Sequence, residues 1–236
     1  LNWLRLRLLE LEAQKARFLQ HVSHELKTPL TALREGSDLL DEEVAGSLNP
    51  RQQEIVRILR DNSIRLRRLI EDLLSYSAAQ SQSSVISRRP VKMRDVVEQV
   101  VSDQKLALQA KALRLAADCA DVVLQGDAEK LRVIADNLIS NAIKFSSRGG
   151  TIRLGLAARA GHAVLEVSDE GPGIAPEDRD RIFDAFYQGR AAASGPVKGT
   201  GLGLSIVKEY VALHHGRVEL VNETDRGAHF RVTLPL

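Results

Sequence analysis

Cysteine is almost absent from this sequence, since Cys119 is the only one among 236 residues. A single thiol excludes an internal disulfide and any metal site built on a CxxC pair. An excess of charge of one sign is also lacking, because 33 Lys and Arg stand against 31 Asp and Glu, so nucleic acid is not expected as a partner. No apolar run approaches the roughly 18 residues that a membrane-spanning helix needs, and no signal peptide is visible. We therefore expect contact with a membrane only through a region upstream of Leu1.

The first third of the sequence, up to about residue 80, has the apolar periodicity of long helices. Residues 1–17 are expected to continue a signalling helix that enters from upstream. A second helix is expected to begin at Pro50, because Asn49 can cap it and Gln52 stands where a capping box needs Glu or Gln. A hairpin of two helices over residues 18–80 buries only one face, so we predict a homodimer in which two copies form a four-helix bundle. The apolar seam of the second helix consists of Ile55, Leu59, Asn62, Leu66, Leu69, Leu73 and Tyr76.

The rest of the sequence alternates between helix and strand patterns, after a polar segment at residues 81–90 that predicts a linker. We expect residues 91–236 to form an α/β sandwich. Ala160 and Gly161 predict a turn between two strands. The expected helices cover residues 93–110, 128–145 and 205–214, and the expected strands cover residues 113–117, 122–125, 151–158, 162–168, 217–222 and 230–234.

The segment HVSHELKTPL at residues 21–30 places a histidine beside a carboxylate on the first helix. An imidazole can accept a phosphoryl group on one ring nitrogen if a carboxylate holds or takes the proton of the other. His24 and Glu25 supply this pair, and Pro29 predicts a bend just beyond it. The apolar spacing also becomes irregular around His24, which locally unwinds a coiled coil. Most histidines on helices are ordinary surface residues, and we interpret His21 in this way.

The segment DNLISNAIKF at residues 136–145 predicts a helix with one polar stripe. Asn137, Asn141 and Lys144 fall at i, i+4 and i+7, away from the apolar side. Two amides and an ammonium that face one way can gather phosphate oxygens and Mg²⁺, which takes oxygen ligands and phosphate as a co-ligand. Taken alone, such a stripe is more often a solvated polar face.

A turn with the sequence SDEGPGI follows the strand expected at residues 162–168. Asp169, at the end of that strand, can accept a hydrogen bond from an adenine amino group. Gly171 and Gly173 allow the backbone to pass close to a flat base. Turns of this composition are also common without any ligand.

The segment KGTGLGLSIVKEY at residues 198–210 leads from glycines straight into a helix. Backbone N–H groups and the positive end of a helix then face an anion such as a triphosphate. The P-loop pattern and the βαβ context of a dinucleotide site are both lacking, so a nucleotide is expected to be held in another way. Upstream, Phe183, Phe186 and Tyr187 precede a loop of small residues, which predicts a hinged lid anchored at both phenylalanines. The alternative is a surface loop beside two core phenylalanines.

In this order, the motifs resemble the H, N, G1, F and G2 boxes of the bacterial sensor histidine kinases. The resemblance covers essentially the whole chain and implies a HisKA dimerisation and phosphotransfer hairpin followed by an ATP-binding domain of the GHKL, or Bergerat, fold. It implies that His24 is phosphorylated from ATP with Glu25 as the base, and that the phosphoryl group then passes to an aspartate of a response regulator. Thr28 matches the position that orients water in members with phosphatase activity. The segments REGSDLL and GSLNPRQQEIVRILRDNS are similar to the QseE/GlrK branch of the family.

The nucleotide-binding residues of the family carry over onto matching positions of this sequence. Asn141 is the implied Mg²⁺ ligand and Asp169 the implied reader of adenine. The implied ATP-binding residues are Asn137, Asn141, Lys144, Asp169, Gly171, Gly173, Phe186, Lys198, Gly199, Thr200, Gly201, Leu202, Gly203 and Leu204. The resemblance also implies a cytoplasmic location for this part of the protein, with the full-length protein anchored in the inner membrane.

Two other functions are compatible with parts of the pattern. A GHKL ATPase of the chaperone or topoisomerase type would hydrolyse ATP to drive a conformational change, but it would have no need of His24 beside Glu25. A degenerate kinase would only scaffold or dephosphorylate its partner. The presence of Asn141, Asp169 and the glycine loop argues against that second alternative.

Overall fold

The computed structural model describes residues 2–44, 46–80, 86–189, 199–221 and 227–236. The chain divides into two compact units, Leu1–Ser84 and Val85–Leu236. The first is helical and the second mixes helices with strands, as predicted. Within the described ranges, no helix is both long enough and apolar enough to cross a membrane.

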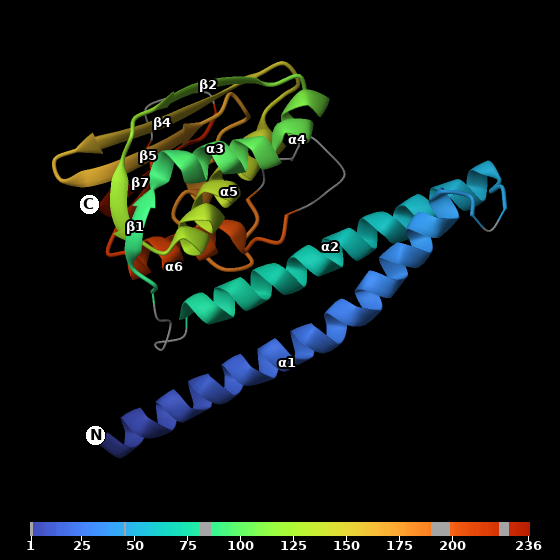
Figure 1. Ribbon diagram of the computed structural model, residues 1–236, viewed down its shortest axis with the longest axis horizontal. Coiled ribbons are helices and arrows are strands. Elements are labelled where there is room, and N and C mark those ends of the chain that lie inside the picture. The colour runs from blue at the N-terminus through green and yellow to red at the C-terminus, as the bar shows by residue number, and fades with distance from the viewer. Residues whose placement is uncertain (1, 45, 81–85, 190–198, 222–226) are drawn as a thin grey trace. The chain divides into compact units, whose positions relative to one another are not determined.

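The first unit is a hairpin of two long helices, α1 (Asn2–Asp41) and α2 (Pro50–Gln80), shown in Figure 1. The expected start of α2 is confirmed, because Asn49 N–H donates to Gln52 Oε1 and Gln52 N–H donates to Asn49 Oδ1, both at 2.9 Å. This reciprocal capping box satisfies N–H groups that have no partner within the helix. Helix α1 changes direction along its length, and it contains Pro29, which has no N–H to continue the helical ladder.

Each helix of the hairpin buries a row of residues at seven-residue spacing. The buried rows are Ser23, Leu30 and Ser37 on α1, and Val56, Ser63 and Ile70 on α2. The Ser37 and Ser63 hydroxyls can be buried because they donate to backbone carbonyls of their own helices, at 2.8 and 2.9 Å. The first half of the predicted seam of α2 is not covered, since Ile55, Leu59 and Leu66 are 51, 50 and 45% exposed. A single copy of the chain therefore leaves an apolar stripe open.

The second unit is an α/β sandwich, as predicted. Its strands are β1 (Arg89–Lys92), β2 (Arg114–Cys119), β3 (Val123–Gly126), β4 (Thr151–Arg159), β5 (His162–Ser168), β6 (Arg217–Leu220) and β7 (His229–Pro235); its helices are α3 (Met93–Asp103), α4 (Lys105–Ala110), α5 (Ala128–Phe145) and α6 (Gly203–Leu213), with a short 3-10 helix at Pro176–Asp178. The main sheet has the order β2-β4-β5-β7-β6, in which β2 and β4 are parallel and the other pairs antiparallel. Strands β1 and β3 form a separate antiparallel pair. Helices α3, α5 and α6 cover one face of the main sheet (Figure 1).

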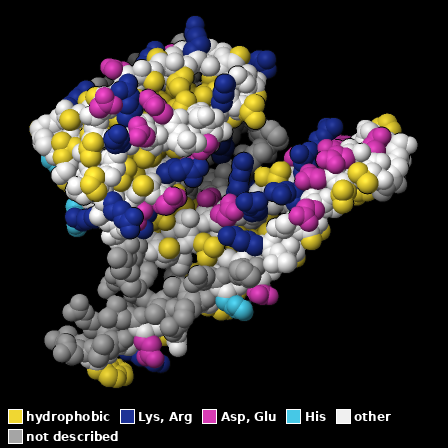
Figure 2. All heavy atoms as spheres, in the orientation of Figure 1, with side chains coloured by type: hydrophobic (Ala, Val, Ile, Leu, Met, Phe, Trp, Pro, Cys, Tyr) yellow, Lys and Arg dark blue, Asp and Glu magenta, His cyan; other side chains and the backbone are white. Residues whose placement is uncertain are grey.

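Alternation of side chains along the strands creates the core of this unit. Leu154, Val167 and Phe230 are cross-strand neighbours on β4, β5 and β7, and all three are buried. On the other face of the sheet, Arg231 donates to Glu166 across β5 and β7 at 2.7 Å. Figure 2 shows positive and negative side chains intermixed on the face in view, in line with the balanced composition.

The elements differ from the predicted ones at a few boundaries. The helix expected over residues 93–110 is interrupted at Gln104, whose side chain donates to Asp136 Oδ1 on α5 at 2.8 Å. Arg89 and Pro90, which the sequence placed in the linker, belong to β1. Pro90 is tolerated there because β1 pairs on one side only.

Candidate active site

Helix α5 carries the polar stripe of the candidate site. Asp127 caps its start by accepting the N–H of Lys130 at 3.3 Å. The apolar side of the helix is fully packed, which fixes its rotation and leaves Asn137, Asn141 and Lys144 half-buried on one side. The packed residues include Leu131, Ile134, Ala135, Leu138, Ile139 and Ala142.

The glycine loop faces this stripe at two points. A Cβ on Gly199 would lie 2.6 Å from the Lys144 ammonium, and a Cβ on Gly203 would lie 2.5 Å from Asn137 Oδ1. Glycine at both positions therefore lets the loop and the helix approach closely. Asn137 Nδ2 donates to Val133 O at 2.9 Å, which leaves its oxygen turned toward the start of α6. Burial lowers the pKa of the Lys144 ammonium, so a nearby anion would stabilise its charged form.

Within the glycine loop, Thr200 and Leu202 stabilise the conformation of the loop. Thr200 Oγ1 accepts the N–H of Leu202 at 3.2 Å. The Leu202 side chain is 0% exposed, so it anchors the loop in the core and could meet a ligand only through its backbone. Leu204 is half-buried in the first turn of α6, which begins at Gly203, two residues earlier than expected. Lys198 lies outside the described residues.

Asp169 lies just after β5 and is 8% exposed. Its Oδ1 accepts the N–H of Gly171 at 2.8 Å and the N–H of Ala228 at 3.2 Å. Burial raises the pKa of this carboxyl, and the two N–H donors act in the opposite direction. Both hydrogen bonds go to one oxygen, so the other carboxylate oxygen can accept a donor from a ligand. A Cβ on Gly171 would lie 2.7 Å from Phe145 O, so glycine at this position allows the turn to pack closely against the end of α5.

Two residues that were not predicted, Gly227 and Ala228, hold Asp169 in place. Asp169 N–H donates to Ala228 O at 3.0 Å. Gly227 has a φ of 80° and packs so closely on the Asp169 carbonyl that no side chain fits. Gly173, with a φ of 73°, packs against Gly227 in turn. The glycine shortly before the last expected strand is the signal that could have identified this contact.

The aromatic segment before the glycine loop is only partly anchored as predicted. Phe183 packs edge-on against Phe230, with 6.3 Å between ring centroids. The Phe186 side chain is 60% exposed, so the expectation of two phenylalanine anchors is wrong for Phe186. The backbone of Phe186 instead has a φ of 64° and lies against Gly201, where a Cβ would come within 2.7 Å of it. Phe186 thus touches the glycine loop through its main chain.

Two further hydrogen bonds fix the same segment. Tyr187 Oη donates to Asp178 Oδ1 at 2.7 Å, and Asp178 is only 3% exposed. Gln188 Nε2 donates to Gly199 O at 2.8 Å. None of these three side chains was predicted as a site residue, because each acts on the loop and not on a ligand.

The first unit carries the predicted phosphoacceptor motif on α1. His24 lies in this helix, and its side chain is outside the described part of the structure. Glu25 and Thr28 are both exposed on the same helix. The predicted phosphoacceptor and the predicted nucleotide-binding residues are therefore carried by different units.

The polar side chains of the second unit suit Mg²⁺, which needs few protein ligands, better than they suit a metal ion whose ligands all come from the protein. Among the described residues, no group of three His, Cys, Asp or Glu side chains is arranged to hold a metal ion. The Asn141 amide makes no hydrogen bond within the described part of the chain, so its oxygen is available to a cation. Mg²⁺ keeps several waters and commonly binds through few protein ligands plus substrate phosphates.

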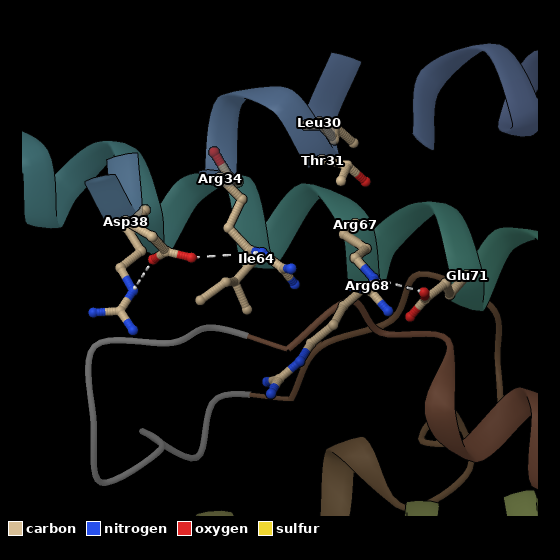
Figure 3. Close-up of a pocket in the computed structure, with 10 residues that line it drawn as sticks. Leu30, Thr31, Arg34, Asp38, Ile64, Arg67, Arg68 and Glu71 are labelled. Atoms are coloured by element: carbon tan, nitrogen blue, oxygen red, sulfur yellow. Dashed lines mark hydrogen bonds and ion pairs between the residues drawn. The ribbon is translucent and has the colours of Figure 1, made fainter. Parts of the chain in front are cut away.

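A groove lies between α1 and α2, and its α1 residues come from the part of that helix that follows His24 in sequence (Figure 3). Its lining residues are Leu30, Thr31, Arg34 and Asp38 from α1, and Arg60, Ser63, Ile64, Arg67, Arg68 and Glu71 from α2. Arg60 pairs with Asp38 at 3.0 Å and Arg67 pairs with Glu71 at 2.9 Å. Four guanidinium groups against two carboxylates leave the groove with an excess of positive charge.

Known families match both units. Residues 14–82 match the His Kinase A (phospho-acceptor) domain, and residues 126–236 match the histidine kinase-, DNA gyrase B-, and HSP90-like ATPase. Sensor histidine kinase GlrK of Escherichia coli K12 is 39% identical over 99% of this chain and 49% of its own length, and QseE of Escherichia coli O157:H7 gives the same values. SenX3 of Mycobacterium tuberculosis H37Rv is 33% identical over 95% of this chain and 55% of its own. The chain thus spans about half the length of these curated relatives.

Solved structures give the same result. Full-length ShkA in complex with AMPPNP superimposes with a TM-score of 0.74 and 30% identity, over 93% of this chain and 45% of ShkA. Histidine kinase AdeS of Acinetobacter baumannii superimposes with a TM-score of 0.65 and 26% identity, over 90% of this chain and 97% of AdeS. Residues 91–125, which lie between the two family matches, fold with the second unit.

Proposed function

Because the chain belongs to the sensor histidine kinase family, we propose that it phosphorylates its own His24 from ATP and passes the phosphoryl group to an aspartate of a response regulator. One observation carries this proposal. Helix α5, the Asp169 turn and the glycine loop are far apart in sequence, yet they meet in the second unit with close contacts at Gly171, Gly199 and Gly203. The first unit supplies His24 beside Glu25.

In the proposed ATP complex, Asp169 accepts a hydrogen bond from the adenine amino group, and Gly171 and Gly173 let the backbone approach the base. Asn137 and Lys144 face the phosphates. The glycine loop offers backbone N–H groups at the start of α6, where the helix dipole favours negative charge. Phe186 and Lys198 belong to the same proposed site, together with Thr200, Gly201, Leu202 and Leu204.

Asn141 is the residue that would hold Mg²⁺ in this site. The ion would neutralise charge on the phosphates when bound. The chain itself supplies the amide oxygen of Asn141, which its place on a packed helix keeps turned to the same side as Lys144. Positioning and charge neutralisation are the main demands of phosphoryl transfer.

The proposed reaction forms one bond and breaks another at the γ-phosphorus. A ring nitrogen of His24 attacks in line with the leaving oxygen, and ADP departs with the electron pair of the broken P–O bond. Glu25 holds or takes the proton on the other ring nitrogen. In the second step, a carboxylate oxygen of the regulator attacks the phosphorus and His24 is the leaving group. In a separate phosphatase reaction, Thr28 would orient the water that removes the phosphoryl group from the regulator.

The groove of the first unit supports a receiver domain as partner. Its α1 residues begin at Leu30, just beyond His24, and its excess of Arg suits an acidic surface. The open stripe of Ile55, Leu59 and Leu66 supports pairing with a second copy of the chain through residues 18–80.

The experiment is incubation of the chain with γ-labelled ATP. We expect acid-labile, alkali-stable label on the wild type, and none on His24→Gln, which should still bind ATP. Asp169→Asn should weaken ATP binding about tenfold to a hundredfold, because the amide presents N–H groups to the adenine donor. Asp118→Asn, at an exposed carboxylate of β2, is the matched control.

Acid-labile label on His24→Gln would contradict the proposed phosphoacceptor. Release of inorganic phosphate without label on the wild type would favour the ATPase alternative instead.

A further inference from the structure

The last turn of α5 is closed by a side chain from elsewhere in the chain. Lys111, which follows α4, donates from Nζ to the carbonyl oxygens of Ile143, Lys144 and Ser146, at 2.8, 2.7 and 3.2 Å. The last carbonyls of a helix have no donor within the helix. Ser146 ends α5 in an extended conformation, without the left-handed residue that often supplies such donors. One ammonium with three N–H groups meets this need.

The backbone around Lys111 is tied to the same part of the chain. Gly149 N–H donates to Lys111 O at 2.9 Å, and Arg114 N–H donates to Gly150 O at 2.9 Å. Lys111 is half-buried. Its ammonium therefore has a fixed position, unlike that of a lysine on an open surface.

The turn that Lys111 holds is the part of α5 that meets both loops of the candidate site. Lys144 lies against Gly199 in the glycine loop, and Phe145 O lies against Gly171 in the Asp169 turn. A shift of this turn would move the Lys144 ammonium relative to the loop. Misplacement of a binding group by about 1 Å is enough to cost a large part of its effect.

A positive charge at this place also has an electrostatic reason. The C-terminal end of a helix carries partial negative charge, which favours a cation close to the last carbonyls. The Lys111 ammonium offsets that charge. Burial lowers the pKa of Lys111, and the three carbonyl contacts compensate the cost of burying the charge.

We propose that Lys111 is a positioning residue for ATP, which fixes the last turn of α5 and thereby places Lys144 against the glycine loop. The inference rests on the proposed ATP site. Lys111 points at backbone carbonyls and acts on the nucleotide through Lys144, so its effect on binding should depend on whether Lys144 is present.

The test is the dissociation constant of Mg-ATP for the full chain, measured by calorimetry at a temperature where circular dichroism shows each variant folded. Lys111→Met keeps the aliphatic stem and removes the donors and the charge, and we expect about tenfold weaker binding. Lys105→Met, at an exposed position of α4, should bind like the wild type. In a Lys144→Met background, Lys111→Met should weaken binding by less than about twofold, because the two effects share one group.

Lys111→Gln keeps two N–H donors and serves if Lys111→Met does not fold, with an expected loss of about threefold. Wild-type affinity in a folded Lys111 variant would overturn the inference, as would a full loss in the Lys144→Met background. A residue that served only stability would lower the melting temperature and leave affinity unchanged. A wild-type chain that binds no ATP would overturn the proposed function itself, so the two failures are distinguishable.

Discussion

At the scale of single residues, His214 joins the two helices that carry the candidate site. Asp127 N–H, at the cap of α5, donates to His214 Nε2 at 3.1 Å, and His214 Nδ1 faces Tyr210 O on α6 at 2.7 Å. Nε2 must accept and Nδ1 must donate, so only the neutral ring with its proton on Nδ1 satisfies both contacts. Burial lowers the pKa of His214, and the Tyr210 carbonyl acts in the opposite direction. Protonation would therefore work against the contact between α5 and α6.

We expect His214 to make the stability of the second unit depend on pH. Its pKa is lower in the folded state, so the unfolded chain takes up the proton first as the pH falls. The stabilisation is fully present above the ordinary histidine value of about 6.5 and is lost as the pH falls through the folded pKa. Urea unfolding at about pH 7.5 and about pH 5.5 should show a larger loss for the wild type than for His214→Gln, which cannot titrate. His162→Gln, at an exposed histidine, should follow the wild type, and an equal pH dependence of all three proteins would rule the idea out.

At the scale of helices and strands, boundaries set by neighbours in sequence could be predicted. Asn49 and Gln52 cap α2 and Asp127 caps α5, because a cap acts over three residues. The interruption at Gln104 could not be predicted, since its side chain bonds to Asp136, 32 residues away. The buried rows of the hairpin were difficult to predict for another reason. Ser37 and Ser63 are polar residues, yet they are buried because their hydroxyls donate to carbonyls of their own helices.

The residues of the candidate site also fall into those that the sequence could predict and those that it could not. Asn137, Asn141 and Lys144 share a side of α5 because helical spacing puts them there, which the sequence alone predicts. Lys111 and Ala228 could not be predicted, because they meet α5 and Asp169 only once the sheet brings distant segments together. Residues that would touch a ligand were thus easier to identify than residues that hold them in place.

The capping box of α2 leads to a prediction at this scale. Asn49→Ala removes one of its two hydrogen bonds and leaves the Gln52 N–H without its acceptor, so we expect the first turn of α2 to open more often. The backbone amides of this turn should exchange with deuterium about fivefold faster, which corresponds to a fall of about 1 kcal/mol in the free energy of opening. Hydrogen exchange with mass spectrometry on peptides covering residues 50–56 measures this. Arg51→Ala, one residue into the helix and exposed, should exchange like the wild type. Unchanged exchange in Asn49→Ala would show that the cap does not limit opening.

At the scale of the whole chain, the proposed dimerisation and the proposed ATP binding belong to different units. The proposed nucleotide-binding residues lie in Val85–Leu236, and the open apolar stripe lies in Leu1–Ser84. Besides the α2 stripe, Leu33 of α1 is 58% exposed in a single copy. Full removal of one such side chain from water stabilises an assembly by about 1.5–3 kcal/mol, so covering several of them favours a second copy. We therefore expect that one unit can be altered without loss of the function proposed for the other.

Leu66→Glu should therefore convert a dimeric chain into a monomer that still binds ATP. The substitution places a carboxylate in the stripe, where pairing with a second copy would bury it without a partner at a cost of several kcal/mol. Analytical ultracentrifugation reports the mass, and calorimetry with Mg-ATP reports binding to the same sample. Arg57→Glu is the control, because it puts a carboxylate on an exposed position of α2 outside the stripe, and it should remain dimeric. A Leu66→Glu chain that remained dimeric would place the pairing surface elsewhere. A monomer that lost ATP binding would instead show that the nucleotide site depends on the first unit.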